Sequence, residues 1–205
     1  MLSIDESLNL PFSFRHYVEC LTLGSEKFGW SKRNPAIGSM KHDGVTLGWG
    51  MAGAAWVAGR FAAEANIQLR DDGTVRVACA TQDIGTGTYT ILAQLASEKT
   101  GVPLEKIDVE LGDSALPEGP LSGGSLETSS VIPAVFKAAD QAIASLFMIA
   151  VTTPGSPFIG RQPGDLALES GCVFLKSNGS AGALPFGELL RQANARLSPA
   201  AVVRK

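Results

Sequence analysis

The sequence predicts an α+β fold in which a mixed sheet with a β-hairpin packs against helices. Apolar and polar residues alternate on both sides of an Asp-Asp-Gly turn within residues 65–81, which is the pattern of a hairpin. Residues 88–99 and 129–150 instead carry apolar side chains three and four positions apart, which is the period of helices with a buried face. With 205 residues, 45% of them hydrophobic, the chain is long enough to enclose one core.

The N-terminal residues are expected to hold a short helix and a packed lead-in segment. Helical spacing over residues 14–23 makes Ser13 the candidate N-cap and Gly24 the residue that ends the helix. Residues 28–44 are rich in turn formers, which indicates an irregular surface segment whose basic side chains are either solvated or close to a phosphate or a partner subunit. Residues 45–63 interleave Gly, Ala and two Trp, which predicts a buried strand closely approached by another backbone.

Turn chemistry and periodicity predict the remaining elements. The hairpin turn lies at Asp71, Asp72 and Gly73. The later elements are expected in this order: a helix over 88–99 stopped by Gly101, a strand over 106–111, a loop over 112–125, a helix over 129–150 with Pro133 in its first turn, a hairpin around Ser170 and Gly171, and a helix over 186–195. Three parts are therefore expected, with residues 1–64 as the N-terminal part, 65–151 as the core and 152–205 as a C-terminal extension.

Charge and cysteine content exclude several classes of function. A net charge of −3 without a run of Lys or Arg provides no electrostatic footprint for nucleic acid or for an anionic membrane. The first ten residues lack the pattern of a signal peptide, and the most apolar stretch is interrupted by charged residues, so a soluble, cytoplasmic protein is expected. Cys20, Cys79 and Cys172 are odd in number and far apart, which fits reduced thiols and neither a disulfide framework nor a metal site.

Two glycine-rich turns are the candidate functional site. One contains Gly85, Thr86 and Gly87, and the other runs over residues 122–125 with the sequence Ser-Gly-Gly-Ser. Each turn precedes a helical segment, where backbone N–H groups are free to meet an anion, so the pair predicts a site for a phosphate-bearing cofactor. From the residues alone, glycines that only cap the two helices remain an equal alternative.

The first turn also imitates a dinucleotide-binding fingerprint. Gly85 and Gly87 follow a strand and open a helix, and Glu110 lies about twenty residues further on, as that motif requires. Thr90 replaces the third glycine, and the preceding strand belongs to a hairpin rather than to a doubly wound parallel sheet. A nicotinamide or flavin site is therefore the weaker interpretation.

Several motifs in order resemble a known family of enzymes. The run DIGTGTYTILAQLASEKTGVPLEKIDVELGDSALPEGPLSGGS, residues 83–125, is similar to the region of molybdopterin-binding subunits of the xanthine dehydrogenase and aldehyde oxidase family in which two turns hold the pterin cofactor. The upstream runs YVECLTLGSEKFGW and DGVTLGWGMA resemble the segments that precede it in bacterial aldehyde oxidoreductases. The resemblance extends over residues 12–150 and more weakly to residue 196.

The resemblance implies a role for each residue of the two turns. The loop that would face the cofactor's phosphates consists of Asp83, Gly85, Thr86, Gly87 and Thr88. The residues that would lie against the pterin and the ligands of molybdenum are Ser122, Gly123, Gly124 and Ser125. The N–H of Gly124 would approach the metal, which the pterin rather than the protein would ligate, so neither metal-ligating nor catalytic residues are assigned. The implied cofactor is the cytosine dinucleotide form of molybdopterin, with iron–sulfur clusters and FAD on partner subunits.

Two departures from the family pattern are visible. Glu127 stands where a small or neutral side chain is expected, and a carboxylate beside an anionic cofactor is unfavourable unless it points away or is paired. The family's general base is a glutamate in a late Gly-x-Gly-Glu segment, and no Glu of this chain has that context.

The resemblance therefore implies a partial molybdenum-cofactor-binding subunit that is inactive without further chain. The intact enzyme would hydroxylate aldehydes or N-heterocycles with oxygen from water. Its partners would be the remaining parts of the molybdenum subunit, an iron–sulfur subunit, a possible FAD subunit and a small-molecule substrate. It would be cytoplasmic, or periplasmic through a partner's signal. The alternatives are an inactive truncated remnant and a stand-alone nucleotide-binding module.

Overall fold

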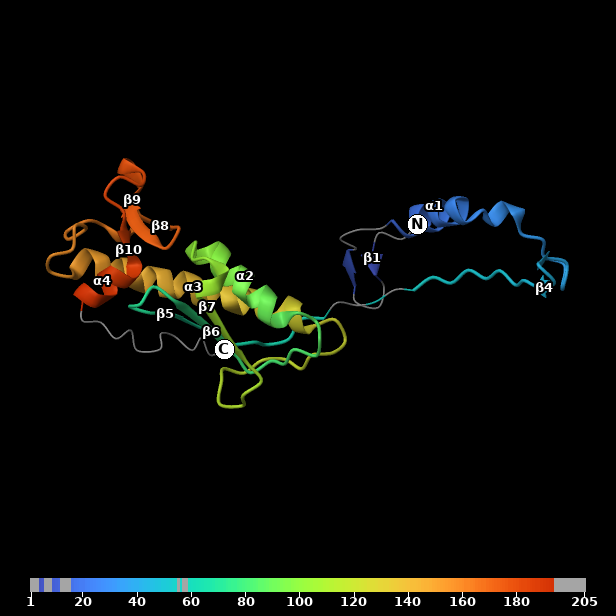
Figure 1. Ribbon diagram of the computed structural model, residues 1–205, viewed down its shortest axis with the longest axis horizontal. Coiled ribbons are helices and arrows are strands. Elements are labelled where there is room, and N and C mark those ends of the chain that lie inside the picture. The colour runs from blue at the N-terminus through green and yellow to red at the C-terminus, as the bar shows by residue number, and fades with distance from the viewer. Residues whose placement is uncertain (1–3, 6–8, 12–15, 55, 57–58, 194–205) are drawn as a thin grey trace. The chain divides into compact units, whose positions relative to one another are not determined.

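The computed structural model describes residues 4–5, 9–11, 16–54, 56 and 59–193. The chain divides into two compact units, Met1–Trp56 and Val57–Lys205, and each is described by itself (Figure 1).

The first unit consists of short elements around one helix. Strands β1 (Ile4–Asp5) and β2 (Leu10–Pro11) pair antiparallel, and so do β3 (Lys41–His42) and β4 (Val45–Thr46). Helix α1 (Tyr17–Phe28) is followed by a 3-10 turn over Trp30–Lys32.

Helix α1 extends further than the sequence predicts. Gly24 lies inside the helix, and Gly29 ends it in the left-handed conformation with φ of 80°. The prediction that Gly24 ends the helix is therefore wrong, because Gly29 satisfies the same left-handed cap one turn later. The predicted N-cap, Ser13, lies outside the described residues.

The expected buried strand over residues 45–63 is also wrong. Of the described residues in that range only Val45–Thr46 form a strand, and Trp56 is 73% exposed. Small Gly and Ala side chains suit an extended surface segment as well as a packed strand, and the sequence pattern cannot separate the two. The segment meets α1 through an edge-to-face contact between Phe28 and Trp49, whose ring centroids lie 4.8 Å apart.

The second unit is built on a three-stranded sheet in the order β5-β6-β7. Strand β5 (Asn66–Leu69) pairs antiparallel with β6 (Val75–Cys79), which confirms the predicted hairpin. Strand β7 (Ile107–Leu111) pairs parallel with β6 after a crossover through α2 (Thr88–Thr100). The mixed sheet of the α+β prediction is thereby confirmed, but β6 belongs both to a hairpin and to a parallel pair.

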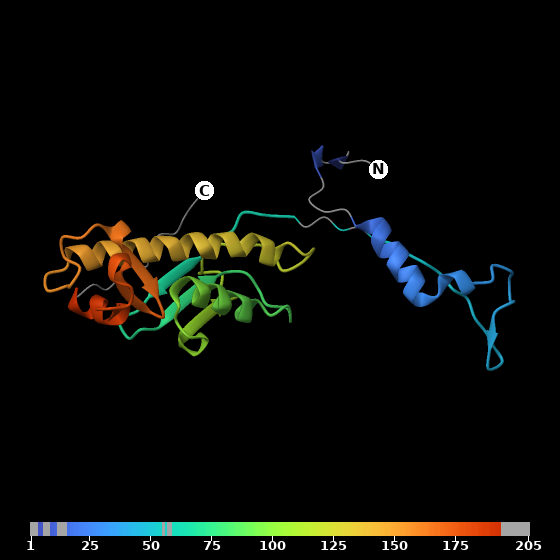
Figure 2. The same ribbon diagram turned by 90° about the horizontal axis from the view of Figure 1, so that it is seen from above.

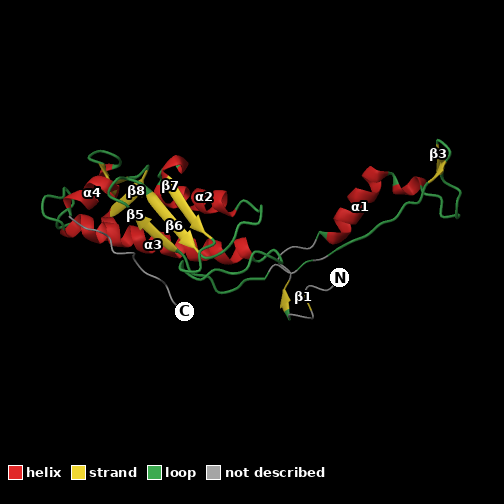
Figure 3. Ribbon diagram, turned by 60° about the horizontal axis from the view of Figure 1, so that its bottom comes forward, coloured by secondary structure: helices red, strands yellow, loops and turns green. Residues whose placement is uncertain are grey.

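Helices α2 and α3 (Glu127–Thr152) pack against each other and against the sheet (Figures 2 and 3). Because α3 begins at Glu127, Pro133 lies in its second turn and not in its first as expected. By length and composition α3 is apolar enough to span a membrane, and its buried side belongs to the core of this unit. The core residues contributed by the sheet and the two helices include Ile67, Leu69, Val75, Val77, Leu92, Ala96, Val131, Val135, Ala139 and Leu146.

The C-terminal elements join the same core. Strands β8 (Leu166–Glu169), β9 (Cys172–Leu175) and β10 (Leu184–Pro185) form an antiparallel sheet, and α4 (Phe186–Gln192) follows. Short 3-10 turns lie at Leu104–Lys106, Pro163–Asp165 and Lys176–Asn178. The predicted hairpin at residues 170–171 and the helix that begins at residue 186 are confirmed, although residues 194–195 lie outside the described residues. Among others, Leu166, Val173, Phe186 and Leu189 bury their side chains in the core.

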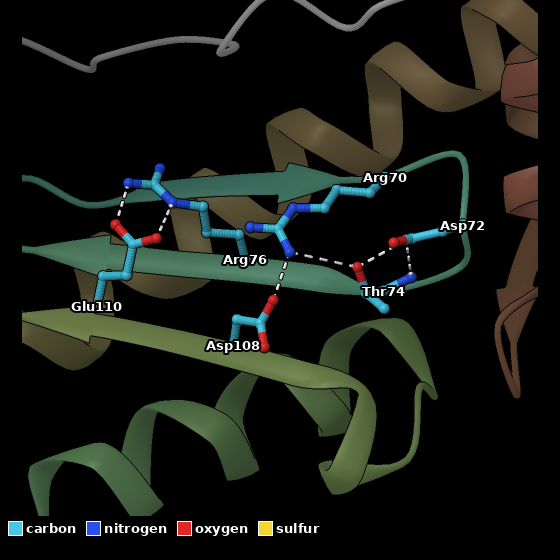
Figure 4. A network of polar contacts seen from close by, with 6 residues as sticks. All are labelled: Arg70, Asp72, Thr74, Arg76, Asp108 and Glu110. Atoms are coloured by element: carbon cyan, nitrogen blue, oxygen red, sulfur yellow. Dashed lines mark hydrogen bonds and ion pairs between the residues drawn. The ribbon is translucent and has the colours of Figure 1, made fainter.

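The face of the sheet opposite the core carries ion pairs (Figure 4). Arg76 Nε donates to Glu110 Oε1 at 2.7 Å, and its Nη2 donates to Oε2, so the two side chains form a bidentate pair between β6 and β7. Arg70 pairs with Asp108 beside them. The hydrogen bonds from Arg76 hold the pKa of Glu110 below its ordinary value of 4.5.

We expect the Glu110→Gln variant to be less stable at neutral pH by about 1 kcal/mol or less, because the pair is partly exposed. A carboxyl whose folded-state pKa is depressed contributes stability above its unfolded pKa and loses it as the pH falls through the folded pKa. Urea unfolding should therefore show a difference between wild type and variant at pH 7 that shrinks as the pH falls below 4.5 and is lost below the lower folded-state pKa of Glu110. Glu105→Gln, at an exposed position, is the control and should show no such pH-dependent difference.

Candidate functional site

The structure brings the two glycine-rich turns to one cavity. Gln82, just before the first turn, accepts the hydrogen of the Ser122 hydroxyl on its carbonyl oxygen, and its Oε1 accepts from the Ser122 N–H at 3.2 Å. A cavity of about 500 Å³ opens beside this contact. Its lining residues are Ile84, Thr86, Ser122, Gly123, Gly124, Ser125, Leu126, Glu127 and Thr128. The second turn is thus entirely at the cavity, whereas the first turn contributes Thr86 and its neighbour Ile84.

The second turn presents unbonded backbone donors. Gly124 and Ser125 have positive φ values of 60° and 57°, a conformation that is strained for serine. Within the described residues, the N–H groups of Gly123 and Ser125 have no hydrogen-bond acceptor. Helix α3 begins two residues later, so its N-terminal partial positive charge lies at the same place. An anion in the cavity would therefore meet both open amides and a helix N-terminus.

The first turn is bonded by its own carboxylate. Asp83 Oδ1 accepts from the N–H of Gly85 at 2.8 Å and of Gly87 at 3.2 Å, and Oδ2 accepts from the N–H of Tyr89 at 3.4 Å. Desolvation raises the pKa of Asp83, but the backbone hydrogen bonds together lower it more, so the net pKa lies below the ordinary value. The carboxylate is charged at neutral pH and accepts hydrogen bonds from backbone N–H groups that the sequence analysis expected to bind a phosphate.

Thr88 and Glu127 meet beneath the turns. Thr88 is 1% exposed and Glu127 is 5% exposed, and the Thr88 hydroxyl donates to Glu127 Oε2 at 3.0 Å. The Thr86 hydroxyl lies 3.2 Å from that of Thr88. The carboxylate of Glu127, which the sequence marked as unfavourable beside an anion, is therefore bonded to side chains of this chain.

Thr81 and Gln82 are site residues that the sequence analysis did not identify. Both lie shortly after the alternating pattern of β6, which ends at Cys79.

The structure weighs against the dinucleotide fingerprint. Glu110, which would bind a ribose hydroxyl in that motif, is held by Arg76 on the far face of the sheet. Thr90 is exposed on α2, where the motif has a glycine for close packing.

Within the part of the chain that the structure describes, groups of three or more His, Cys, Asp and Glu side chains that could hold a metal ion are absent.

Two known proteins that are similar to this chain are named as subunits of an oxidoreductase and of a dehydrogenase. The Escherichia coli K12 aldehyde oxidoreductase molybdenum-binding subunit PaoC is 42% identical over 130 residues, which cover 62% of this chain and 18% of that protein. One of the subunits of nicotinate dehydrogenase from Pseudomonas putida is 34% identical over 135 residues, or 64% of this chain and 10% of that protein. The chain thus spans less than a fifth of the length of these relatives.

Solved structures agree in fold. Reconstituted CO dehydrogenase from Oligotropha carboxidovorans superposes with a TM-score of 0.54 and 25% identity over 66% of this chain and 17% of that one. Quinoline 2-oxidoreductase from Pseudomonas putida 86 does so with a TM-score of 0.52 and 21% identity over 68% of this chain and 18% of that one. A family model described as the molybdopterin cofactor-binding domain matches residues 23–203. The resemblance seen in the sequence is thereby confirmed, and this chain belongs to the molybdopterin cofactor-binding domain family.

Proposed function

We propose that this chain forms part of the cofactor cradle of a molybdenum hydroxylase that oxidises aldehydes or N-heterocycles with water as the source of oxygen. The cavity between the two turns, with the open N–H groups of Gly123 and Ser125, is the observation that carries this proposal. Family membership supports molybdopterin as its occupant. When bound, that group would supply the oxygen-transfer and redox chemistry, while this chain binds and orients it.

The two turns have different tasks in this proposal. Gly123 and Ser125 provide backbone donors for a phosphate or for the polar edge of the pterin, and Ser122 and Gly124 complete the lining of the second turn. Asp83 closes the first turn on the amides of Gly85 and Gly87, so this turn contributes mainly its shape and the Thr86 hydroxyl. Thr88 acts beneath the cavity through Glu127. In this proposal the phosphate therefore contacts the second turn, and not the first turn as the sequence analysis expected.

Further chains complete the enzyme in this proposal. The general-base segment is missing from the sequence, so the remaining parts of the molybdenum subunit must supply it, together with iron–sulfur and FAD subunits for electron transfer. PaoC is named a molybdenum-binding subunit and the other relative a subunit of nicotinate dehydrogenase, which supports such an assembly. We further propose the cytosine dinucleotide form of the cofactor, a cytoplasmic location, and residues 65–151 as the cofactor-binding core between the two flanking parts.

Metal loading tests the proposed function. The full chain is produced in a host that makes molybdenum cofactor, together with the adjacent chains of the subunit, and purified for elemental analysis. We expect molybdenum to copurify with it, and acid hydrolysis to release a cytosine nucleotide. Absence of molybdenum under every co-expression would identify an inactive remnant. A melting temperature raised by added nucleotide alone would instead identify a nucleotide-binding module.

Two glycine substitutions distinguish an effect on cofactor binding from a general loss of stability. Gly124 and Gly112 both have positive φ, at 60° and 80°, so alanine strains the backbone at each by about 1–2 kcal/mol, and at Gly124 the added Cβ would also lie 3.2 Å from Leu126 Cδ2. Of these two glycines, only Gly124 lines the cavity. We expect Gly124→Ala to lower molybdenum content about tenfold, equivalent to about 1.4 kcal/mol of binding, whereas Gly112→Ala retains it. Equal loading of both variants would contradict the assignment of the second turn.

A further inference from the structure

Glu127 occupies the point where the segments around the cavity meet. It is the first residue of α3, two positions after the second turn, and Thr88 is the first residue of α2, directly after Gly87 of the first turn. Their side chains are bonded across 39 positions of sequence. From this arrangement we infer that Glu127 is a positioning residue that sets the spacing of the two turns, a role that rests on the proposed function of the cavity.

The contacts of Glu127 reach three segments. Its Oε2 accepts from the Thr88 hydroxyl at 3.0 Å, and its Oε1 lies 3.4 Å from the Thr81 hydroxyl at the end of β6. Thr81 in turn donates at 2.9 Å to the carbonyl oxygen of Pro120, which lies just before the second turn. One buried carboxylate therefore bonds the start of α2 to the start of α3 and lies 3.4 Å from the Thr81 hydroxyl at the end of β6, whose hydrogen is donated to Pro120.

Charge makes this link sensitive to distance. None of the ion pairs among the described residues includes Glu127, so its carboxylate relies on hydroxyl donors and on the N-terminus of α3. A buried carboxylate that loses a donor is unfavourable, and the Thr88 contact at 3.0 Å is shorter than those with Thr81 at 3.4 Å and Thr128 at 3.5 Å, so its loss would weaken the arrangement most. Burial raises the pKa of Cys79 at the end of β6, and the nearby Glu127 carboxylate raises it further.

A second link lies on the exposed side. Gln82 is exposed and Ser122 is half-buried, and their hydrogen bonds join the segment before the first turn to the second turn. Glu127, which is 5% exposed and lines the cavity, is the buried link, and it holds the cavity open before any ligand arrives. Its negative charge also directs an anionic group away from the floor and toward the amides of Gly123 and Ser125.

Hydrogen exchange on the full chain without cofactor tests this role. Thr88→Val removes the hydroxyl with little change in shape, and we expect it to speed exchange in the peptide covering residues 122–132 about tenfold, although that peptide contains no substitution. Thr90→Val is the matched control on the exposed side of α2 and should leave exchange unchanged. Thr88→Ser retains the donor and should restore wild-type exchange.

Substitutions of Glu127 complete the test. Glu127→Ala should speed exchange in residues 122–132 as Thr88→Val does, and the double variant should exchange no faster than Glu127→Ala alone. Glu127→Gln keeps an acceptor of the same size and should restore protection. Unchanged exchange in Glu127→Ala, or a uniform increase that includes α4, would overturn the positioning role. Because the cofactor is not needed here, this result and molybdenum loading can fail independently.

Discussion

Gly101→Ala is expected to destabilise the second unit by about 3 kcal/mol or more, the combined cost of a left-handed non-glycine residue and of overpacking. Gly101 has φ of +66°, and an added Cβ would lie 2.2 Å from the backbone nitrogen of Ser170 and 2.9 Å from its Cα. The β8–β9 turn is bonded to the end of α2 at this place, since the Gly171 N–H donates to the carbonyl oxygen of Thr100 at 3.2 Å. Urea unfolding at pH 7 measures the change.

Gly112→Ala is the matched control for this variant. Gly112 also has a positive φ, of +80°, but an added Cβ would meet nothing within 4 Å. Its variant should lose only about 1–2 kcal/mol, the strain of the left-handed conformation. An equal loss of stability in the two variants would contradict this prediction. It would mean that the β8–β9 turn can shift away from α2 at no cost in free energy.

Leu146→Ala is expected to destabilise the protein by about 2–5 kcal/mol, because it removes a core side chain and leaves a cavity. Leu146 is 0% exposed on the side of α3 that contributes to the core. Met148, two residues further along the same helix, is 52% exposed. Met148→Ala should change stability by about 0.5 kcal/mol or less, and equal losses would contradict the orientation of α3. Urea unfolding of the three proteins decides.

Elements defined by local signals were predictable. The Asp72-Gly73 turn between alternating segments specifies the β5–β6 hairpin, and the apolar periodicity of residues 129–150 specifies α3 to within two residues at each end. The position of the second turn was also predictable, since a Ser-Gly-Gly-Ser run before a helical segment marks a turn, although its residues alone did not separate an anion site from a helix cap.

Features that depend on distant partners were not predictable. The end of α1 depended on which of two glycines, Gly24 or Gly29, adopts the left-handed conformation. The segment after β4 has small residues that fit both a packed strand and a surface chain. In the first turn, the sequence contains both the amides and the Asp83 carboxylate, but only the folded backbone directs that carboxylate at Gly85 and Gly87.

By itself, the sequence determined that helices α1 to α4 exist, the β5–β6 and β8–β9 hairpins, the two glycine turns and the resemblance to the family, because period, turn chemistry and motif spacing are written in neighbouring residues. The tertiary structure alone decided that β6 also pairs parallel with β7, that the turns share one cavity, and that Glu127 is bonded to Thr88 beneath it. The physical reason is distance along the chain. A hydrogen bond across 39 residues exists only after the sheet and both helices have packed, and no local pattern contains it.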